Sequence, residues 1–271
     1  MRRVRRLLHA VLPPFALALL RDGAARLRHR LHDRKVIRRS YAGFPLELEI
    51  GDENAATWYG EDWPEPEELR VLRTHALRPG ARVYDLGAHQ AVVALVMARL
   101  VGDDGAVVAL EASPYDAEVA ERNRVRNSAQ NLLVLNAAVA AESGRIEFGL
   151  DGRVGSRGSG WPTSAVRAFA VDDLATQYGD PDVVFIDVEG YEAEALKGAT
   201  SVLAKRPDVF VEVHGEEALA RFGSTPPEVV SFFPDDAFEL LAATPNGDPF
   251  SPLDRGAAPR ERFFLLALGR R

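Results

Sequence analysis

The chain has 271 residues, 46% of them hydrophobic, which is enough to bury one large α/β core. It contains no cysteine, so disulfide frameworks, thiolate zinc sites and cysteine nucleophiles are excluded. The formal net charge of −7 is unevenly distributed: residues 1–39 hold twelve Arg/Lys and two Asp, a charge of +10, and the rest of the chain carries −17.

Residues 1–40 are predicted to form a basic, partly amphipathic, helical extension. Its apolar stretch, LLHAVLPPFALALL, is interrupted by Pro13-Pro14 and is too short to span a bilayer of about 30 Å. The arginines that follow argue against export, so we expect a cytoplasmic protein, with peripheral contact at the inner membrane face as one reading of residues 1–39. The other reading is a solvated helix pair packed on the domain. Nucleic acid is not an expected partner, because no aromatic or base-reading motif interleaves the arginines.

Residues 41–80 are predicted to lead into the core. In LELEI, Leu46, Leu48 and Ile50 alternate with polar residues, as in a half-exposed strand. The segment EPEELRVLRTHALRPG then reads as a helix that stops at Pro79-Gly80.

Residues 81–271 alternate between apolar strands and helices. Strands are predicted at VYDL (83–86), AVVALE (106–111), LLVLN (132–136), DVVFID (182–187) and DVFVEV (208–213), and helices at 91–100, 114–127, 191–204 and 216–221. This alternation indicates a doubly wound, mainly parallel α/β sheet. Residues 237–243 and 262–269 are typical of a closing hairpin with a long loop.

The stretch VYDLGAHQAVVALVMA (83–98) predicts a strand that turns at Gly87 into a helix. Such a bend gathers free backbone N–H groups and a positive helix end, which suits a carboxylate or phosphate, although a glycine can also serve only to turn the chain. Glu111 ends the next strand, 24 residues after Gly87. This is near the ~20 residues at which an acidic side chain accepts the hydroxyls of a ribose, so a nucleoside pocket is plausible.

Titratable residues follow the fourth and fifth strands: Asp187, Glu189, Glu212 and His214. Ligands of parallel sheets bind outside the carboxyl ends of the strands. Each residue taken alone has a structural explanation. It could cap a helix, lie at the edge of the sheet with its hydrogen bonds satisfied, or pair with an arginine. Together they indicate a catalytic rim, because clustered like charges cost stability unless a ligand, a proton or a metal compensates them.

Several segments between Trp58 and Leu268 match one family: WPEPEELRVL, RPGARVYDLGAH, VVALEASPYDAEVAERNRVRN, LNAAVA, the GSRGSG loop, VDDL, VFVEVH and, most specifically, FIDVEGYEAEALKGA. In these segments the chain resembles an FkbM-type, S-adenosylmethionine-dependent methyltransferase of the class I, Rossmann-like fold. The resemblance implies a class I domain over residues 81–271. It also implies a seven-stranded sheet whose last strand is antiparallel.

The resemblance also implies S-adenosylmethionine as the cofactor and assigns residues to its site. The implied donor residues are Asp85, Gly87, Ala88 and His89 at the bend, Glu111 on the ribose, Ala112 next to it, and Asn136 and Ala137 near the adenine. The implied acceptor residues are Asp187, Glu189, Glu212 and His214. One departure concerns Ala91, which stands where the family usually has a further glycine.

We therefore expect an O-methyltransferase that acts on a hydroxyl of a sugar, glycolipid or natural-product acceptor. In this hypothesis His214 or Asp187 takes the hydroxyl proton, and Glu189 and Glu212 orient the base and the acceptor. No metal belongs to the predicted site, although Asp187, Glu189 and His214 would suit Mg²⁺. Two other classes stay open: a non-catalytic binding module on the same fold, in which Ala91 blocks the donor, and an NAD-dependent oxidoreductase.

Overall fold

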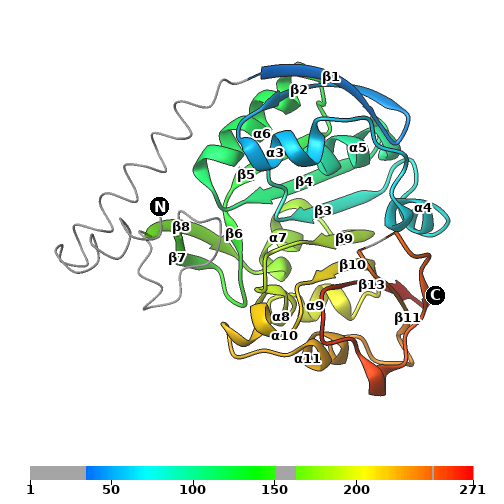
Figure 1. Ribbon diagram of the computed structural model, residues 1–271. Coiled ribbons are helices and arrows are strands. Elements are labelled where there is room, and N and C mark those ends of the chain that lie inside the picture. The colour runs from blue at the N-terminus through cyan, green and yellow to red at the C-terminus, as the bar shows by residue number, and fades with distance from the viewer. Residues whose placement is uncertain (1–34, 150–162, 246, 271) are drawn as a thin grey trace, which may run out of the picture.

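The computed structural model describes residues 35–149, 163–245 and 247–270, and its centre is an eight-stranded sheet (Figure 1). The strand order is β12-β11-β13-β10-β9-β3-β4-β5. Residues 1–34 of the predicted extension and the GSRGSG loop lie outside the described residues.

Five parallel strands form the middle and one edge of this sheet: β3 (Arg82–Leu86), β4 (Ala106–Glu111), β5 (Leu132–Asn136), β9 (Val183–Ile186) and β10 (Asp208–Val213). All five match predicted strands, and helices cover both faces, so the doubly wound fold is confirmed (Figure 1). Alternate residues of one strand face different cores. Val83 packs in the core that includes Leu95 of one helix layer, and Tyr84 packs in the core that includes Leu196 of the other. Burial on both faces explains why the inner strands are continuous apolar runs, whereas the edge strand β5 is partly exposed.

The closing hairpin completes the sheet. The last strand, β13 (Phe263–Gly269), lies antiparallel between β10 and β11 (Phe238–Ala243), as expected. The prediction of seven strands is wrong by one, because the two residues of β12 (Ser251–Pro252), in the long hairpin loop, pair with Leu241 and Ala242. A pairing of two residues has too little apolar pattern to be recognised in the sequence.

The helices around the sheet are α5 (Val92–Val101), α6 (Pro114–Arg126), α7 (Val171–Tyr178), α8 (Glu192–Lys197), α9 (Thr200–Leu203), α10 (Glu216–Ala220) and α11 (Pro226–Ser231), with the short 3₁₀ helix η1 (Arg255–Ala257) in the hairpin loop. The single helix expected at 191–204 is divided into α8 and α9. Gly198 lies at the break, where a Cβ atom would come 2.3 Å from the backbone oxygen of Ala140. The close approach of that neighbouring backbone requires glycine there.

Ahead of the sheet, the chain forms the hairpin β1 (Lys35–Tyr41) and β2 (Phe44–Ile50), then α3 (Glu53–Tyr59) and α4 (Glu67–Arg73). The predicted strand at 46–50 is confirmed and buries its apolar residues, whereas residues 35–40, expected to be helical, are strand. The hairpin crosses α5 and α6 (Figure 1), where Asn123 of α6 accepts a hydrogen bond of 2.6 Å from the backbone N–H of Glu49.

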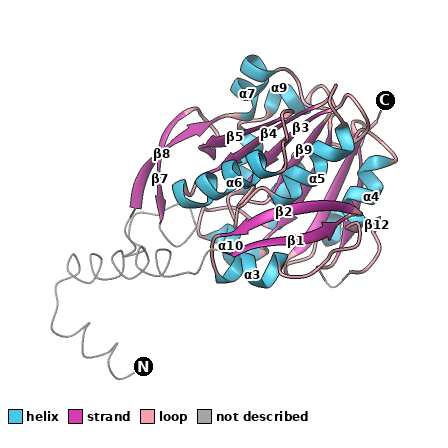
Figure 2. Ribbon diagram, turned by 90° about the horizontal axis from the view of Figure 1, so that it is seen from above, coloured by secondary structure: helices cyan, strands magenta, loops and turns pink. Residues whose placement is uncertain are grey.

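A third sheet joins β6 (Ala138–Val139), β8 (Thr163–Phe169) and β7 (Gly144–Gly149), in that order. Figure 2 shows β7 and β8 projecting beyond the β5 edge of the main sheet. These segments are not among the predicted strands, because they combine short apolar runs with polar residues. The segment of the chain that connects β7 to β8 lies outside the described residues.

Candidate functional site

The carboxyl ends of β3 and β9 meet at the point where the strand order reverses. From β3 the chain proceeds to β4 and β5 in one direction, and from β9 to β10 in the other. In open α/β sheets, ligands bind at this switch point. Gly87 follows β3 with φ +99°, and a Cβ atom there would lie 1.8 Å from the backbone oxygen of Asp187, which follows β9. The two loops therefore touch, and only glycine permits the contact.

The backbone N–H groups of the Gly87 bend are not free, so this part of the sequence prediction is wrong. The N–H groups of Gly87 and Ala88 both donate to the backbone oxygen of Leu110 at 2.9 Å. The N–H of His89 donates to Oε2 of Glu111 at 2.8 Å. The hydrogen bonding between the β3 and β4 segments continues past the ends of the strands. The bend therefore has the Glu111 carboxylate beside it and no unpaired N–H group at residues 87–89.

Glu111 is buried against the bend, as its predicted role requires. Its Oε1 atom accepts a hydrogen bond of 2.6 Å from the backbone N–H of Ser113, and its side chain points toward the bend through the contact with His89. Burial, with the nearby Asp116 carboxylate, raises the pKa of Glu111 to about 7. Hydrogen bonds donated by two hydroxyl groups would stabilise the charged form of a buried carboxylate such as this one.

The residues predicted to lie near an adenine are gathered beside Glu111. Asn136 donates through Nδ2 to the backbone oxygens of Glu111, at 2.9 Å, and of Ala112, at 3.2 Å. The N–H of Ala137 donates to the backbone oxygen of Glu111 at 3.0 Å. The structure thus brings these four residues together at the ends of β4 and β5.

Asp85, at the end of β3, is 3% exposed, and its Oδ2 atom has no hydrogen-bond partner within the described part of the chain. Burial raises the pKa of this carboxyl to about 7. An orphaned buried oxygen is costly unless a proton or a ligand satisfies it.

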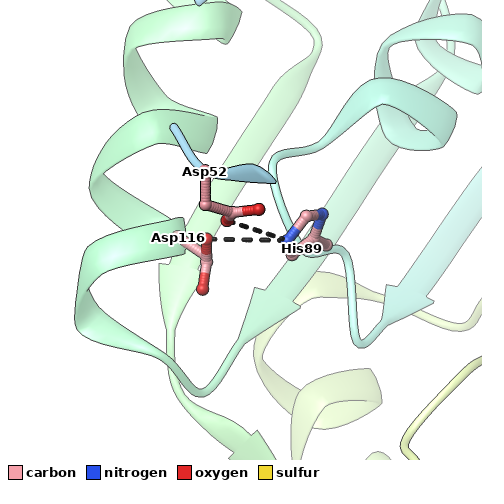
Figure 3. A group of neighbouring side chains, drawn as sticks. All are labelled: Asp52, His89 and Asp116. Carbon is pink, nitrogen blue, oxygen red and sulfur yellow. Dashed lines mark ion pairs between the residues drawn. The ribbon is translucent and has the colours of Figure 1, made fainter. Parts of the chain in front are cut away.

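His89 lies between two carboxylates that come from different parts of the chain (Figure 3). Its Nε2 atom is 3.7 Å from Asp52 and 3.6 Å from Asp116. Burial lowers the pKa of His89, but Asp52 and Asp116 outweigh it, and the net shift is upward. Both carboxylates also accept hydrogen bonds from Gln90 Nε2, at 2.9 and 3.2 Å. These ion pairs and hydrogen bonds therefore fix the start of α3 against the predicted donor bend.

Ala91, the departure from the family pattern, stands at the N-cap of α5 in a left-handed conformation. Ala91 has φ +63° and caps α5, and His89 has φ +48°, so both residues adopt the left-handed conformation that favours glycine. Such conformations cost about 1–3 kcal/mol each and collect at functional sites. The chain keeps a glycine-type loop here at the expense of strain.

The four predicted catalytic residues are close together at the ends of β9 and β10. His214 Nε2 lies 3.6 Å from Asp187 Oδ1, 3.8 Å from Glu189 Oε2 and 3.5 Å from Glu212 Oε1. Glu212 also forms an ion pair with Arg262, a partner of the kind that the structural explanation anticipated. Ligand atoms of Asp187, Glu212 and His214 all lie within 4.8 Å of one another, a spacing that a divalent cation could also use.

Glu192 is a site residue that the sequence analysis did not assign. It is fully buried, and its Oε1 atom lies 2.7 Å from His214 Nδ1 and accepts a 2.9 Å hydrogen bond from the N–H of Gly190. Its sequence signal was its place on the apolar stripe of α8, with Leu196 four positions later. Burial lowers the pKa of His214, but the hydrogen bond and charge of Glu192, with Asp187 and Glu212, raise it to about 9.

Two cavities lie away from these strand ends. One, of about 290 Å³, is between α7 and α9, and the other, of about 560 Å³, is at the amino ends of β3, β4 and β5.

Near the switch point, α3 places Tyr59, whose hydroxyl is 3.3 Å from His89 Nδ1. The sequence analysis did not select this residue.

The sequence matches a family model described as the methyltransferase FkbM domain over residues 85–240, more than half of the chain. The chain belongs to the FkbM methyltransferase family. It is thus a methyltransferase that uses S-adenosylmethionine. The residues at the strand ends fit this cofactor, since Glu111 offers a buried carboxylate at the bend and Asp85 an unsatisfied buried oxygen.

Three of the solved structures to which the chain is similar are named as methylases or methyltransferases. A putative rRNA methylase from Clostridium thermocellum has 10% identity and a TM-score of 0.48, over 75% of this chain and 94% of its own. Methyltransferase FkbM from Methylobacillus flagellatus KT has 14% identity and a TM-score of 0.45, over 69% of this chain and 43% of its own. A putative O-methyltransferase from Klebsiella pneumoniae has 13% identity and a TM-score of 0.47, over 98% of this chain and 96% of its own. No curated protein matches the chain.

Proposed function

We propose that this FkbM-family methyltransferase methylates a hydroxyl oxygen of a sugar, glycolipid or natural-product acceptor. The observation that carries the proposal is His214, held by a buried glutamate and facing three carboxylates beside the Gly87 bend. An oriented base is what a hydroxyl acceptor needs. Several carboxylates around it suit an acceptor with more than one hydroxyl to donate.

The donor half of the proposed site is the end of β3, β4 and β5. S-adenosylmethionine supplies a methyl group on a positively charged sulfur. Glu111 is the proposed acceptor of the ribose hydroxyls. Asp85, Gly87, Ala88 and His89 would line the bend, and Ala112, Asn136 and Ala137 would lie beside the adenine.

The acceptor half is the cluster at β9 and β10. With Nδ1 of His214 held by Glu192, Nε2 is the atom directed toward Asp187, Glu189 and Glu212, and we assign to it removal of the acceptor proton. Asp187 is the alternative base, because burial and the nearby Glu212 carboxylate raise its pKa well above the ordinary value. Glu189 and Glu212 are assigned to orienting the base and the other hydroxyls of the acceptor.

Mass spectrometry tests this function. The protein and S-adenosylmethionine, incubated with glycolipid and metabolite extracts, should yield a product heavier by one CH₂ group and stable to mild base, as an ether is. Glu111→Gln is the matched control. It removes one charged acceptor and is expected to weaken donor binding about 10–100-fold, since a hydrogen bond to a charged group contributes about 1.5–3 kcal/mol. A methyl group found on nitrogen or carbon would contradict the proposal.

We propose that residues 1–39 contact an anionic membrane surface, which would bring a lipid-linked acceptor to the site. In the described part of the chain, no helix is long and apolar enough to cross a bilayer. Deletion should stop at residue 34, because residues 35–41 form β1. The deletion variant is expected to lose flotation with vesicles containing anionic lipid, and flotation equal to that of the full chain would exclude this contact.

A further inference from the structure

Helix α3 is fixed to the donor bend at its first turn. Asp52 caps the helix by accepting a hydrogen bond of 2.8 Å from the N–H of Ala55, and the same carboxylate accepts one from Gln90. The N–H of Gly51 donates to Gln90 Oε1 at 3.0 Å. The helix therefore keeps its position relative to the bend, and so does its last residue, Tyr59.

The Tyr59 ring is held from several sides. It is 6% exposed, its hydroxyl lies 3.3 Å from His89 Nδ1, and the two ring centroids are 5.9 Å apart. Its backbone oxygen accepts a 2.5 Å hydrogen bond from the Tyr41 hydroxyl, and the ring of Trp63 lies 5.3 Å away. These contacts leave the ring little freedom to turn toward solvent.

The two carboxyl groups that act most strongly on the Tyr59 hydroxyl, Asp187 and Asp85, belong to the two strand ends at the switch point. Burial raises the pKa of the Tyr59 hydroxyl well above its ordinary value, and Asp187 and Asp85 raise it further. The phenol is therefore neutral, and its ring has an electron-rich face close to these carboxyl groups. A cation desolvated against such a face gains about 2 kcal/mol or more.

Tyr59 also lies between the two halves of the proposed site. Through His89 it neighbours Glu111, the proposed ribose partner. The bend that contains His89 also touches the backbone of Asp187, in the proposed acceptor cluster, at Gly87. In S-adenosylmethionine, the charged sulfur carries the methyl group that passes to the acceptor, so it is the group that would lie where the donor half meets the acceptor half.

We propose that the ring of Tyr59 is the surface that binds the positively charged sulfur of S-adenosylmethionine. This inference rests on the donor site of the proposed function. It makes Tyr59 a positioning residue with a preference for the charged donor over the neutral S-adenosylhomocysteine, whose sulfur lacks the methyl group and the charge.

Calorimetry with both compounds tests the assignment without any acceptor. The ratio of the two dissociation constants is the readout. Tyr59→Leu and Tyr59→Met, which remove the ring, are expected to weaken S-adenosylmethionine binding about 10-fold more than S-adenosylhomocysteine binding, equivalent to about 1.4 kcal/mol. Tyr59→Phe, which keeps the ring, should preserve the wild-type ratio, as should Tyr178→Leu, a control at the end of α7.

The outcomes separate this inference from the proposed function. If the ring-free variants weaken both compounds equally, or if Tyr59→Phe changes the ratio as much as they do, the sulfur does not lie on the ring and the inference fails. The donor site of the proposed function survives that result provided that Glu111→Gln still weakens both compounds. If Glu111→Gln weakens neither, the donor site itself is wrong. Thermal denaturation of each variant shows that the folded protein is being measured, and Tyr59→Met replaces Tyr59→Leu if the latter does not fold.

Discussion

Replacing His214 with alanine is expected to lower turnover by about 10²–10⁴, the usual contribution of a positioned general base. The imidazole is the group on which Asp187, Glu189 and Glu212 converge, and alanine removes the nitrogen that is assigned to take the acceptor proton. Donor affinity, measured by calorimetry, should stay near the wild-type value, because the proposed donor residues lie on β3, β4 and β5. Full turnover by His214→Ala would move the assignment of the base to Asp187.

The pH dependence of turnover provides an independent readout. His214 can accept a proton only when its imidazole is neutral, and its pKa is raised to about 9. Turnover should therefore rise with pH and level off above about pH 9. Glu192→Gln removes a charge that raises this pKa, so the rise should move to lower pH while the imidazole remains present. A profile that does not move in Glu192→Gln would contradict the role of Glu192 as the residue that holds the base.

Replacing Gly87 with alanine is expected to destabilise the fold by about 3–5 kcal/mol, which corresponds to a fall in Tm of about 6–20 °C for a domain of this size. Two costs add. The residue has φ +99°, a backbone conformation that residues other than glycine rarely adopt. In addition, the new Cβ would overlap the backbone oxygen of Asp187. Because that oxygen belongs to the backbone, relief requires the ends of β3 and β9 to move apart. Thermal and chemical denaturation measure the effect.

Gly80→Ala is the matched control for this experiment. Gly80 has φ +84°, but a Cβ atom there would meet no atom within 4 Å. It therefore reports the backbone cost alone, about 1–2 kcal/mol. If Gly87→Ala is no more destabilising than Gly80→Ala, the contact between the two loops is not as close as the structure indicates.

Local pattern was enough to predict the five parallel strands of the sheet and much of the candidate site. Three strands, β4, β5 and β10, have the bounds expected from their apolar runs. For β4 and β10 the reason is burial on both faces, which requires apolar residues along the whole strand, whereas the edge strand β5 is partly exposed. The cluster around His214 could be predicted because the carboxyl ends of adjacent parallel strands share one edge. No interaction between distant residues had to be known, only the order and direction of the strands.

Tertiary contacts decided the rest. The N–H groups after β3 are bonded to Leu110, Glu192 reaches His214 across 22 positions, and Gln90 joins Asp52 to Asp116. Each depends on which groups meet in space, and hydrophobic periodicity carries no information about that.

The same limit applies to residues 35–40 and to Tyr59. Three of the six residues 35–40 are basic, which gives no strand signal, and pairing with β2 makes them strand. The sequence determined that parallel strands would end in an acidic rim beside a glycine bend. Only the packing of the β1–β2 hairpin and α3 onto that edge decided which side chains complete the site, because the free energy of such packing belongs to surfaces formed by residues far apart in the chain.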